Sequence, residues 1–336
     1  MNSFGQQFRI SIYGESHGNG IGVVIDNCPV GIELSEKDFE QDILRRKSGK
    51  VGTTARTEED IPYIISGVFE GRTTGAPINI MFKNNNIKSK DYSNLRKHPR
   101  PGHSDYVANE KYHGFNDIRG GGIFSGRITL ALVTAGVVAK KILKEISDRI
   151  EINAALKTLN GKIFEDSIEM ENFIKEIQKE GDSVGGVIEC IGKNIPNSLG
   201  EPFFDSVESV VSHLIFSIPG IRGIEFGKGF DSTLLKGSEC NDRIENIYGK
   251  TFTNNCGGIN GGITNGNDIV FRVAVKPTSS IFKPQETFSF EDKKVEILQI
   301  KGRHDAAFVL RVPVIVEACL AIAITDLYLR NRCVKI

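Results

Sequence analysis

Alternation of apolar and polar residues predicts β-strands in the N-terminal part of the chain. This period of two appears in residues 8–13, 22–26, 63–69 and 78–82. A short glycine-containing insert joins the first two stretches, and a hairpin-type connection joins the last two. Because short connections of this kind join antiparallel neighbours, the pattern predicts an antiparallel sheet.

A helical period of apolar residues predicts helices elsewhere. Ser35 and Asp38 resemble a capping box at the start of one helix. Two helices, from Ser125 to about Ile146 and from Pro313 to Leu329, are apolar nearly all round, which predicts burial on most faces. Further helices are expected at residues 167–180 and 206–217, and further strands at residues 184–190 and 270–275.

Strands follow one another too often without an intervening helix for a doubly wound parallel sheet. The glycines at 18, 20 and 22 also miss the dinucleotide-binding spacing. We therefore predict an α+β fold in which long helices lie between antiparallel sheets. We expect one domain over residues 1–336, and the glycine-rich segments 120–122 and 257–263 hint at two related halves.

Charge is balanced, with 42 basic and 42 acidic residues, so no global field attracts nucleic acid or a membrane surface. Six cysteines without a C-x-x-C pair favour reduced thiols over a disulfide or zinc framework. The sequence offers no clustered metal ligands. The N-terminus lacks an export signal, and the apolar run 312–324 is too short to span a bilayer, so a cytoplasmic protein is expected.

Candidate functional residues are concentrated in the segment from Arg100 to Arg127, which contains three consecutive glycines and His103. Arg119 lies in this stretch as well, and further candidates lie in other loops and at one helix end: Arg45, Arg46, Arg303, His17 and Asp305. Arginine binds carboxylate and phosphate bidentately, and histidine can transfer a proton near neutral pH. The residues therefore favour a small polyanionic substrate, with the polar segment 83–97 as a candidate lid and His98, His113 and His213 as structural or surface residues.

A second enzyme class is suggested by residues 14–18, Gly-Glu-Ser-His-Gly, which match the nucleophile elbow of serine hydrolases at Ser16. That elbow requires a helix directly after the serine, whereas a glycine-rich turn and a second strand are expected here. The context therefore disfavours a serine hydrolase.

The same residues resemble the chorismate synthase family from near the first residue to about Arg330. The matching motifs are Gly14-Glu-Ser-His-Gly18, Arg45-Arg46, Ser66-Gly-Val-Phe-Glu-Gly71, Asp91-Tyr-Ser93, Arg100-Pro-Gly-His-Ser-Asp105, Arg119-Gly-Gly-Gly122, Gly257-Gly-Ile-Asn-Gly-Gly262, Lys276-Pro-Thr-Ser-Ser280 and Gly302-Arg-His-Asp305. The resemblance implies a β-α-β sandwich assembled as a homotetramer.

The resemblance also implies a reaction. Members of the family eliminate phosphate from 5-enolpyruvylshikimate 3-phosphate to give chorismate, in the shikimate pathway of aromatic amino-acid biosynthesis. The reaction uses reduced FMN without net redox change, and NADPH enters only indirectly as a source of reducing equivalents. A flavin- or phosphometabolite-binding protein without elimination activity is the alternative.

By resemblance, His17 would protonate the departing phosphate, His103 would protonate the reduced flavin, and Asp305 would assist proton removal. Ser16 and Ser125 match family serines near the reacting centre. Substrate anions would meet Arg45, Arg46, Arg100, Arg119 and Arg127. The flavin would lie against Ile123, Phe124, Ser125, Pro219, Gly220, Gly261, Lys276, Pro277, Thr278, Ser279, Ser280 and Arg303.

The chain departs from the family pattern at several of these positions. Many members have Arg-Ser-Ser after the triple glycine, where this chain has Ile123, Phe124 and Ser125. A common Asn-Ala flavin contact is Pro219-Gly220 here, and Lys47-Ser48 replaces Arg-Pro. These departures leave His17, His103 and Asp305 in place.

Overall fold

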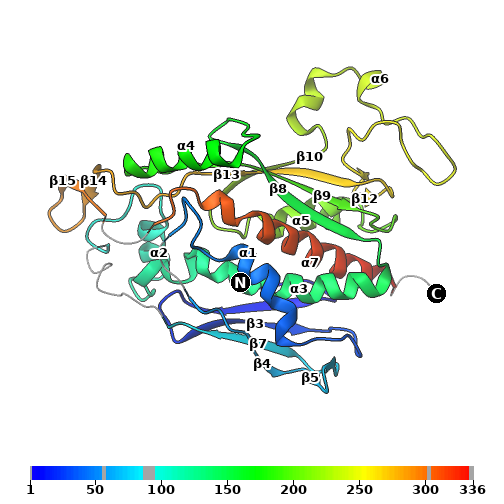
Figure 1. Cartoon of the computed structure of the whole chain (residues 1–336), viewed down its shortest axis with the longest axis horizontal. Coiled ribbons are helices and arrows are strands. Elements are labelled where there is room, and N and C mark those ends of the chain that lie inside the picture. The colour runs from blue at the N-terminus through cyan, green and yellow to red at the C-terminus, as the bar shows by residue number, and fades with distance from the viewer. Residues whose placement is uncertain (1, 55–57, 86–94, 301–303, 333–336) are drawn as a thin grey trace.

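The computed structural model describes residues 2–54, 58–85, 95–300 and 304–332, which fold into three layers (Figure 1). Two antiparallel sheets form the outer layers, and two long helices lie between them. This arrangement confirms the predicted α+β class with helices between antiparallel sheets. Buried apolar residues from both sheets and from the helices belong to one continuous core.

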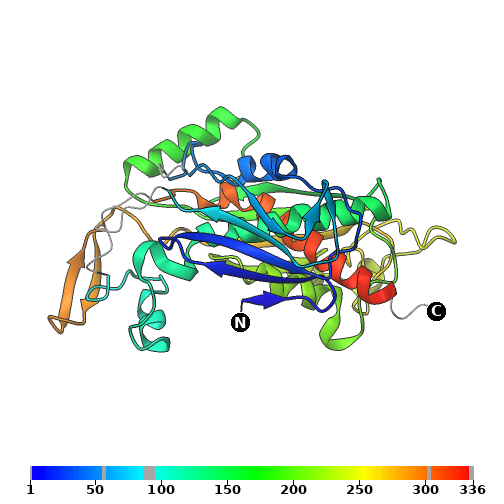
Figure 2. The ribbon, with the colours of Figure 1, turned by 90° about the horizontal axis from the view of Figure 1, so that it is seen from below.

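The first sheet contains the strands expected near the N-terminus. In spatial order they are β1 (Ser3–Phe4), β2 (Arg9–Gly14), β3 (Gly20–Asp26), β7 (Ile78–Lys83) and β4 (Tyr63–Ser66). Alternate residues of a strand point to opposite faces, and Ile21, Val23 and Ile25 of β3 are fully buried. Figure 2 views the molecule from below, with this sheet, in blue and cyan, in front of the helices.

The second sheet closes the other side of the helices. In spatial order its strands are β10 (Ile221–Phe226), β13 (Ile269–Val275), β9 (Gly186–Lys193) and β8 (Glu151–Leu159). Three two-stranded pairs project from the layers: β5 (Val68–Phe69) with β6 (Arg72–Thr73), β11 (Ile259–Asn260) with β12 (Ile263–Thr264), and β14 (Gln285–Ser289) with β15 (Lys294–Leu298).

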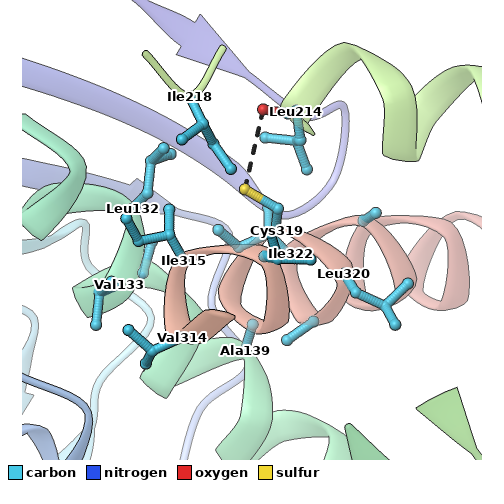
Figure 3. Packing of buried hydrophobic residues seen from close by; sticks show 14 of the residues in the cluster. Leu132, Val133, Ala139, Leu214, Ile218, Val314, Ile315, Cys319, Leu320 and Ile322 are labelled. Atoms are coloured by element: carbon cyan, nitrogen blue, oxygen red, sulfur yellow. Dashed lines mark hydrogen bonds between the residues drawn. The ribbon is translucent and has the colours of Figure 1, made fainter. Parts of the chain in front are cut away.

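The two central helices are α3 (Thr129–Ile146) and α7 (Pro313–Arg332). They pack so closely that a Cβ atom added to Gly136 would lie 2.3 Å from the Cβ of Ala318. Figure 3 shows Ile315 and Cys319 of α7 among apolar side chains of α3 and of the segment around Leu214. The expected burial of both apolar helices is therefore confirmed.

Shorter helices surround this core. They are α1 (Glu40–Arg46), α2 (Asp105–Lys111), α4 (Ser167–Lys179), α5 (Val207–Ile215) and α6 (Gly237–Cys240), with 3₁₀ turns η1 (Glu36–Phe39), η3 (Arg119–Phe124), η4 (Gly126–Ile128), η5 (Phe203–Asp205), η6 (Gly229–Leu234) and η7 (Phe308–Arg311). The Asp38 carboxylate accepts from the backbone N–H of Ser35 at 2.7 Å, as the capping box predicts. Ser125 caps the 3₁₀ turn η4, not the α-helix, because its hydroxyl accepts from the backbone of Arg127.

The last helix also holds the start of the chain. One carboxylate oxygen of Asp326, a buried residue of α7, accepts hydrogen bonds from three successive backbone N–H groups, at 2.9, 2.7 and 2.9 Å. The donors are Gln6, Gln7 and Phe8, directly before β2. This contact fixes the entry of the first long strand onto the helical layer.

The described cysteines, Cys28, Cys190, Cys240, Cys256 and Cys319, are free thiols, in agreement with the sequence prediction, and Cys333 lies outside the described residues. Burial raises the pKa of Cys28 to about 12, so this thiol is protonated at neutral pH. Among the described residues, no helix combines the length and apolar character needed to cross a bilayer.

Candidate active site

A cavity of about 820 Å³ lies at the N-terminal ends of the two central helices. The segment before α3 and the segment before α7 form two of its walls. The remaining walls come from residues 46–48, 54, 58, 60, 100, 102–104, 107, 216–222 and 276–280. Segments that are far apart in sequence therefore form the walls of this cavity, and these walls contain both polar and apolar side chains.

The triple glycine packs directly onto the turn that contains His17. Gly120 has a φ of 60°, and a Cβ atom added there would lie 2.8 Å from both His17 Nε2 and Ser16 Oγ. The backbone N–H of Ser16 donates to Gly122 at 3.2 Å. Ser16 and His17 are both buried. Glycine at position 120 therefore lets the cavity wall approach the imidazole without a side chain between them.

Arg100, His103 and Asp105 form a buried cluster on one side of the cavity. Arg100 binds both carboxylate oxygens of Asp105, each at 2.7 Å. His103 Nδ1 lies 2.7 Å from Asp105 Oδ1, so Nδ1 carries the proton that the carboxylate accepts. Burial lowers the pKa of His103; Asp105 opposes this shift, whereas Arg100 and Lys276 add to it. An anion bound nearby would favour the imidazolium form.

A second charged cluster has Asp60 at its centre. Asp60 accepts from Arg46 Nη2 at 2.9 Å and from Arg127 Nη1 at 2.7 Å, and all three side chains are nearly fully buried. Burial alone would raise the pKa of Asp60, but the two arginines lower it below its usual range. Burial lowers the pKa of Arg46 to about 10, which still leaves it cationic at neutral pH.

This second cluster contains guanidinium hydrogen-bond donors that Asp60 does not accept from. Arg46 Nε, Arg46 Nη1 and Arg127 Nη2 are buried and have no hydrogen-bond partner among the described residues. One carboxylate balances two guanidinium groups, so the cluster keeps a net positive charge against the cavity. Buried unpaired donors are costly, and an anion that accepts from them would remove this cost.

Asp305 lies in the cavity wall before α7. Its carboxylate accepts from the backbone N–H of Thr54 at 2.6 Å and lies 3.2 Å from Arg311 Nη1. These contacts fix the carboxylate between the basic loop after α1 and the 3₁₀ turn η7 that precedes α7. A carboxylate held in this way can accept a proton from a ligand in the cavity.

The opposite wall combines apolar side chains with a polar loop. Ile123, Phe124, Pro219 and Phe308 line the cavity on the apolar side. The loop from Lys276 to Ser280 lines it on the polar side, where Lys276 Nζ donates to the carbonyl of Gly102 at 2.6 Å. A flat heteroaromatic ligand with polar edges would match such a wall.

Nearly the whole chain matches a single family of known proteins. Residues 8–329 match the sequence profile described as chorismate synthase. The chain belongs to the chorismate synthase family. A chorismate synthase from Chitinophaga pinensis is 54% identical over 332 residues, with 99% of this chain and 98% of the relative covered. A chorismate synthase from Christiangramia forsetii is 43% identical over 354 residues, with 100% of this chain and 99% of the relative covered.

A crystal structure of a chorismate synthase has the same fold. It is 27% identical in sequence and superposes with a TM-score of 0.73, covering 98% of this chain and 93% of that chain. Most residues expected by resemblance to the chorismate synthase family lie together around the cavity. Those that line it are Arg46, Arg100, His103, Asp305, Ile123, Phe124, Ser125, Arg127, Pro219, Gly220 and Lys276 to Ser280. Ser16 and His17 contact its glycine wall.

Apart from Ser16 and His17, three described residues of the expected chorismate synthase pattern do not line this cavity. Arg119 is half-exposed and pairs with Asp117 at 2.7 Å. Gly261 lies in the β11–β12 turn, which precedes β13, whereas Lys276 follows the other end of that strand, and Gly261 does not line the cavity. Arg303 lies outside the described residues, as does most of the expected lid at 83–97.

Arg45 is the third of these residues, and it has other partners. Its guanidinium donates to both carboxylate oxygens of Glu317, at 2.7 and 2.6 Å. Glu317 is a buried residue of α7 and also accepts from Lys140 and from the backbone of Ala154. Arg45 thus neutralises a buried carboxylate between the central helices and the second sheet, whereas its neighbour Arg46 faces the cavity.

Replacing each arginine by glutamine should show which one binds substrate and which one stabilises the fold. Arg46→Gln should raise the substrate KM by about 10–100-fold, the loss expected for a charge-assisted hydrogen bond. Arg45→Gln should leave KM within about twofold but lower the free energy of unfolding by roughly 1–3 kcal/mol. Steady-state kinetics and denaturant unfolding measure the two effects. Equal increases in KM would place Arg45 in the binding site after all.

Sequence reasoning missed Asp60, Asn84 and Arg311. Asp60 ends an acidic run with Glu58 and Glu59, and such runs are usually solvated surface. Asn84 follows a strand at the start of a polar segment, which is typical of an exposed loop. Of the other histidines, His304 also lines the cavity, whereas His98 lies 3.1 Å from Glu296 and His213 contacts the ring of Phe4.

Proposed function

We propose that the chain performs the reaction of its family, the 1,4-elimination of phosphate from 5-enolpyruvylshikimate 3-phosphate to give chorismate. The observation that carries this proposal is the set of unpaired, buried guanidinium nitrogens of Arg46 and Arg127 beside the cavity. The substrate has two carboxylates and a phosphate, which are the acceptors that such donors bind best. The family match, together with this pairing of donors and acceptors, supports a carbon–oxygen lyase of the shikimate pathway.

We further propose reduced FMN as the cofactor, and the residues present fit it. Ile123, Phe124 and Phe308 offer an apolar surface for a flat ring system. Thr278 Oγ1, in the adjoining loop, is buried, has no hydrogen-bond partner in the described part of the chain, and would meet a polar edge of the ring. When bound, the reduced flavin supplies electron density that weakens the bond between carbon and the phosphate oxygen. NADPH would act only as an indirect source of reducing equivalents.

The protein's own residues hold and move protons around this reaction. His17, under Gly120, would donate a proton to the departing phosphate, and Arg46 and Arg127 would stabilise its charge. His103, oriented by Asp105, would hold a proton on the flavin side. Asp305, fixed by Thr54 and Arg311, would assist in removing the substrate proton. Ser16 and Ser125 lie next to these groups, and their hydroxyls would form hydrogen bonds with the bound ligands.

Anaerobic incubation with enolpyruvylshikimate phosphate and chemically reduced FMN tests this function. Chorismate and inorganic phosphate should form in equal amounts and should be absent with oxidised FMN. Absence of chorismate with reduced FMN would refute the proposed reaction. Tight FMN binding without turnover would instead identify a flavin-binding protein that lacks elimination activity.

We also propose that the chain assembles as a homotetramer. The segment around α6 projects from the body of the protomer (Figure 1) and exposes Phe230, Leu234, Ile247 and Tyr248, each at least 80% exposed. Exposed apolar side chains gathered on one projection are typical of a protein interface. Light scattering should give a mass of four chains of 37.0 kDa each, and a monomer would refute the proposed assembly.

A further inference from the structure

Asn84 connects the anion-binding arginines to the turn that contains His17. It follows β7 directly and is 8% exposed. Its Oδ1 accepts from Arg127 Nε at 2.6 Å. Its Nδ2 donates to the backbone carbonyls of Glu15 at 3.0 Å and Gly18 at 2.8 Å. Because a guanidinium can only donate and a carbonyl can only accept, these partners define the orientation of the amide.

The two sides of this amide belong to two functional parts of the site. On the Oδ1 side, Arg127 is bound to Asp60, which in turn binds Arg46. On the Nδ2 side, the two acceptors are the residues at either end of the turn that includes His17. The backbone N–H of Asn84 also donates to Asn19 at 3.2 Å. One buried side chain therefore fixes both parts relative to each other.

We propose that Asn84 is a positioning residue that sets the placement of His17 relative to Arg127. The inference rests on the proposed function, in which Arg127 holds the leaving phosphate and His17 protonates it. Arg127 and His17 must contact the phosphate at the same time. A displacement of either side chain by about 1 Å can lower the rate by about 10²-fold. Asparagine suits this position because its short amide accepts on one side and donates twice on the other.

Changing Asn84 to aspartate separates the two sides of the amide. The carboxylate is almost the same size and still accepts from Arg127, but it cannot donate to the turn. The carbonyls of Glu15 and Gly18 would then face a negative charge and the turn would loosen. We expect kcat to fall by about 30-fold or more, while the substrate Kd, measured with oxidised FMN so that turnover is absent, changes by less than about fivefold.

Asn84→Leu removes both contacts and should raise the substrate Kd about tenfold in addition to lowering kcat. Asn79→Asp is the matched control, since Asn79 lies on β7, the strand that Asn84 follows, and its Oδ1 accepts from Tyr13 at 2.8 Å, a bond that aspartate can also make. This control should keep the kcat of the unmodified protein.

The outcomes distinguish this inference from the function on which it rests. If the unmodified protein forms no chorismate, the proposed function fails. If it does, and Asn84→Asp keeps kcat within twofold, only the role of Asn84 is refuted. A fall in kcat that merely follows the fraction of unfolded protein, measured by circular dichroism at the assay temperature, would also refute positioning in favour of a purely structural role.

Discussion

Replacing His17 or His103 by alanine is expected to lower kcat by roughly 10²–10⁴-fold, the range for a positioned acid or base. Each imidazole is buried or nearly so beside the glycine wall, and each is held by its surroundings: His103 by Asp105, and His17 by the turn under Gly120. Solvent water is a poor replacement because it is neither oriented nor of suitable pKa. Anaerobic steady-state kinetics with reduced FMN measures the effect.

His113→Ala provides the control for these two variants, because His113 is exposed at the end of α2 and lines no part of the cavity. It should keep the kcat of the unmodified protein. The substrate KM of the two active-site variants should change by less than about tenfold, since neither imidazole is assigned the binding of an anion. Turnover near that of the unmodified protein in either variant would remove that histidine from the mechanism.

Gly120→Ala is expected to lower kcat by about 10²-fold, the loss that accompanies a displacement of about 1 Å in a catalytic group. The added methyl would lie 2.8 Å from His17 Nε2 and from Ser16 Oγ, well inside van der Waals contact, so the imidazole or the glycine loop must move. The backbone φ of 60° also disfavours alanine by about 1–2 kcal/mol.

Gly161→Ala isolates the backbone effect from the steric one. Gly161 has a φ of 76°, but an added Cβ would have no atom within 4 Å. This variant should lose similar stability in thermal unfolding and keep the kcat of the unmodified protein. If Gly120→Ala is equally active, the close approach between the glycine loop and His17 has no part in catalysis.

The layers of the fold could be predicted because the pattern of residues within a single segment is enough to identify it as a strand or a buried helix. Period-two stretches gave the strands of the first sheet, and the nearly uniform apolar character of residues 313–329 gave a buried helix. Strand order could not be obtained in this way. The pairing of β13 with both β9 and β10 depends on contacts between distant segments, which a local pattern does not record.

The site was predicted less completely because neighbours in sequence can have different environments. Arg45 and Arg46 are adjacent on α1, and a helix turns by about 100° per residue, so they face different directions. One binds Glu317 and the other faces the cavity. Asp60 lies 14 residues from Arg46 and 67 from Arg127, and no spacing rule brings these three together.

The contact of Asp326 with the backbone of residues 6–8 bears on how the protein is made. It joins positions 318 to 320 residues apart, so the start of β2 cannot be anchored in this way until α7 has left the ribosome. At roughly 5–20 residues per second, this delay lasts tens of seconds. Throughout that time α3 and the second sheet also lack α7, the helix that packs against both, so the nascent chain should expose their apolar surfaces until α7 is made.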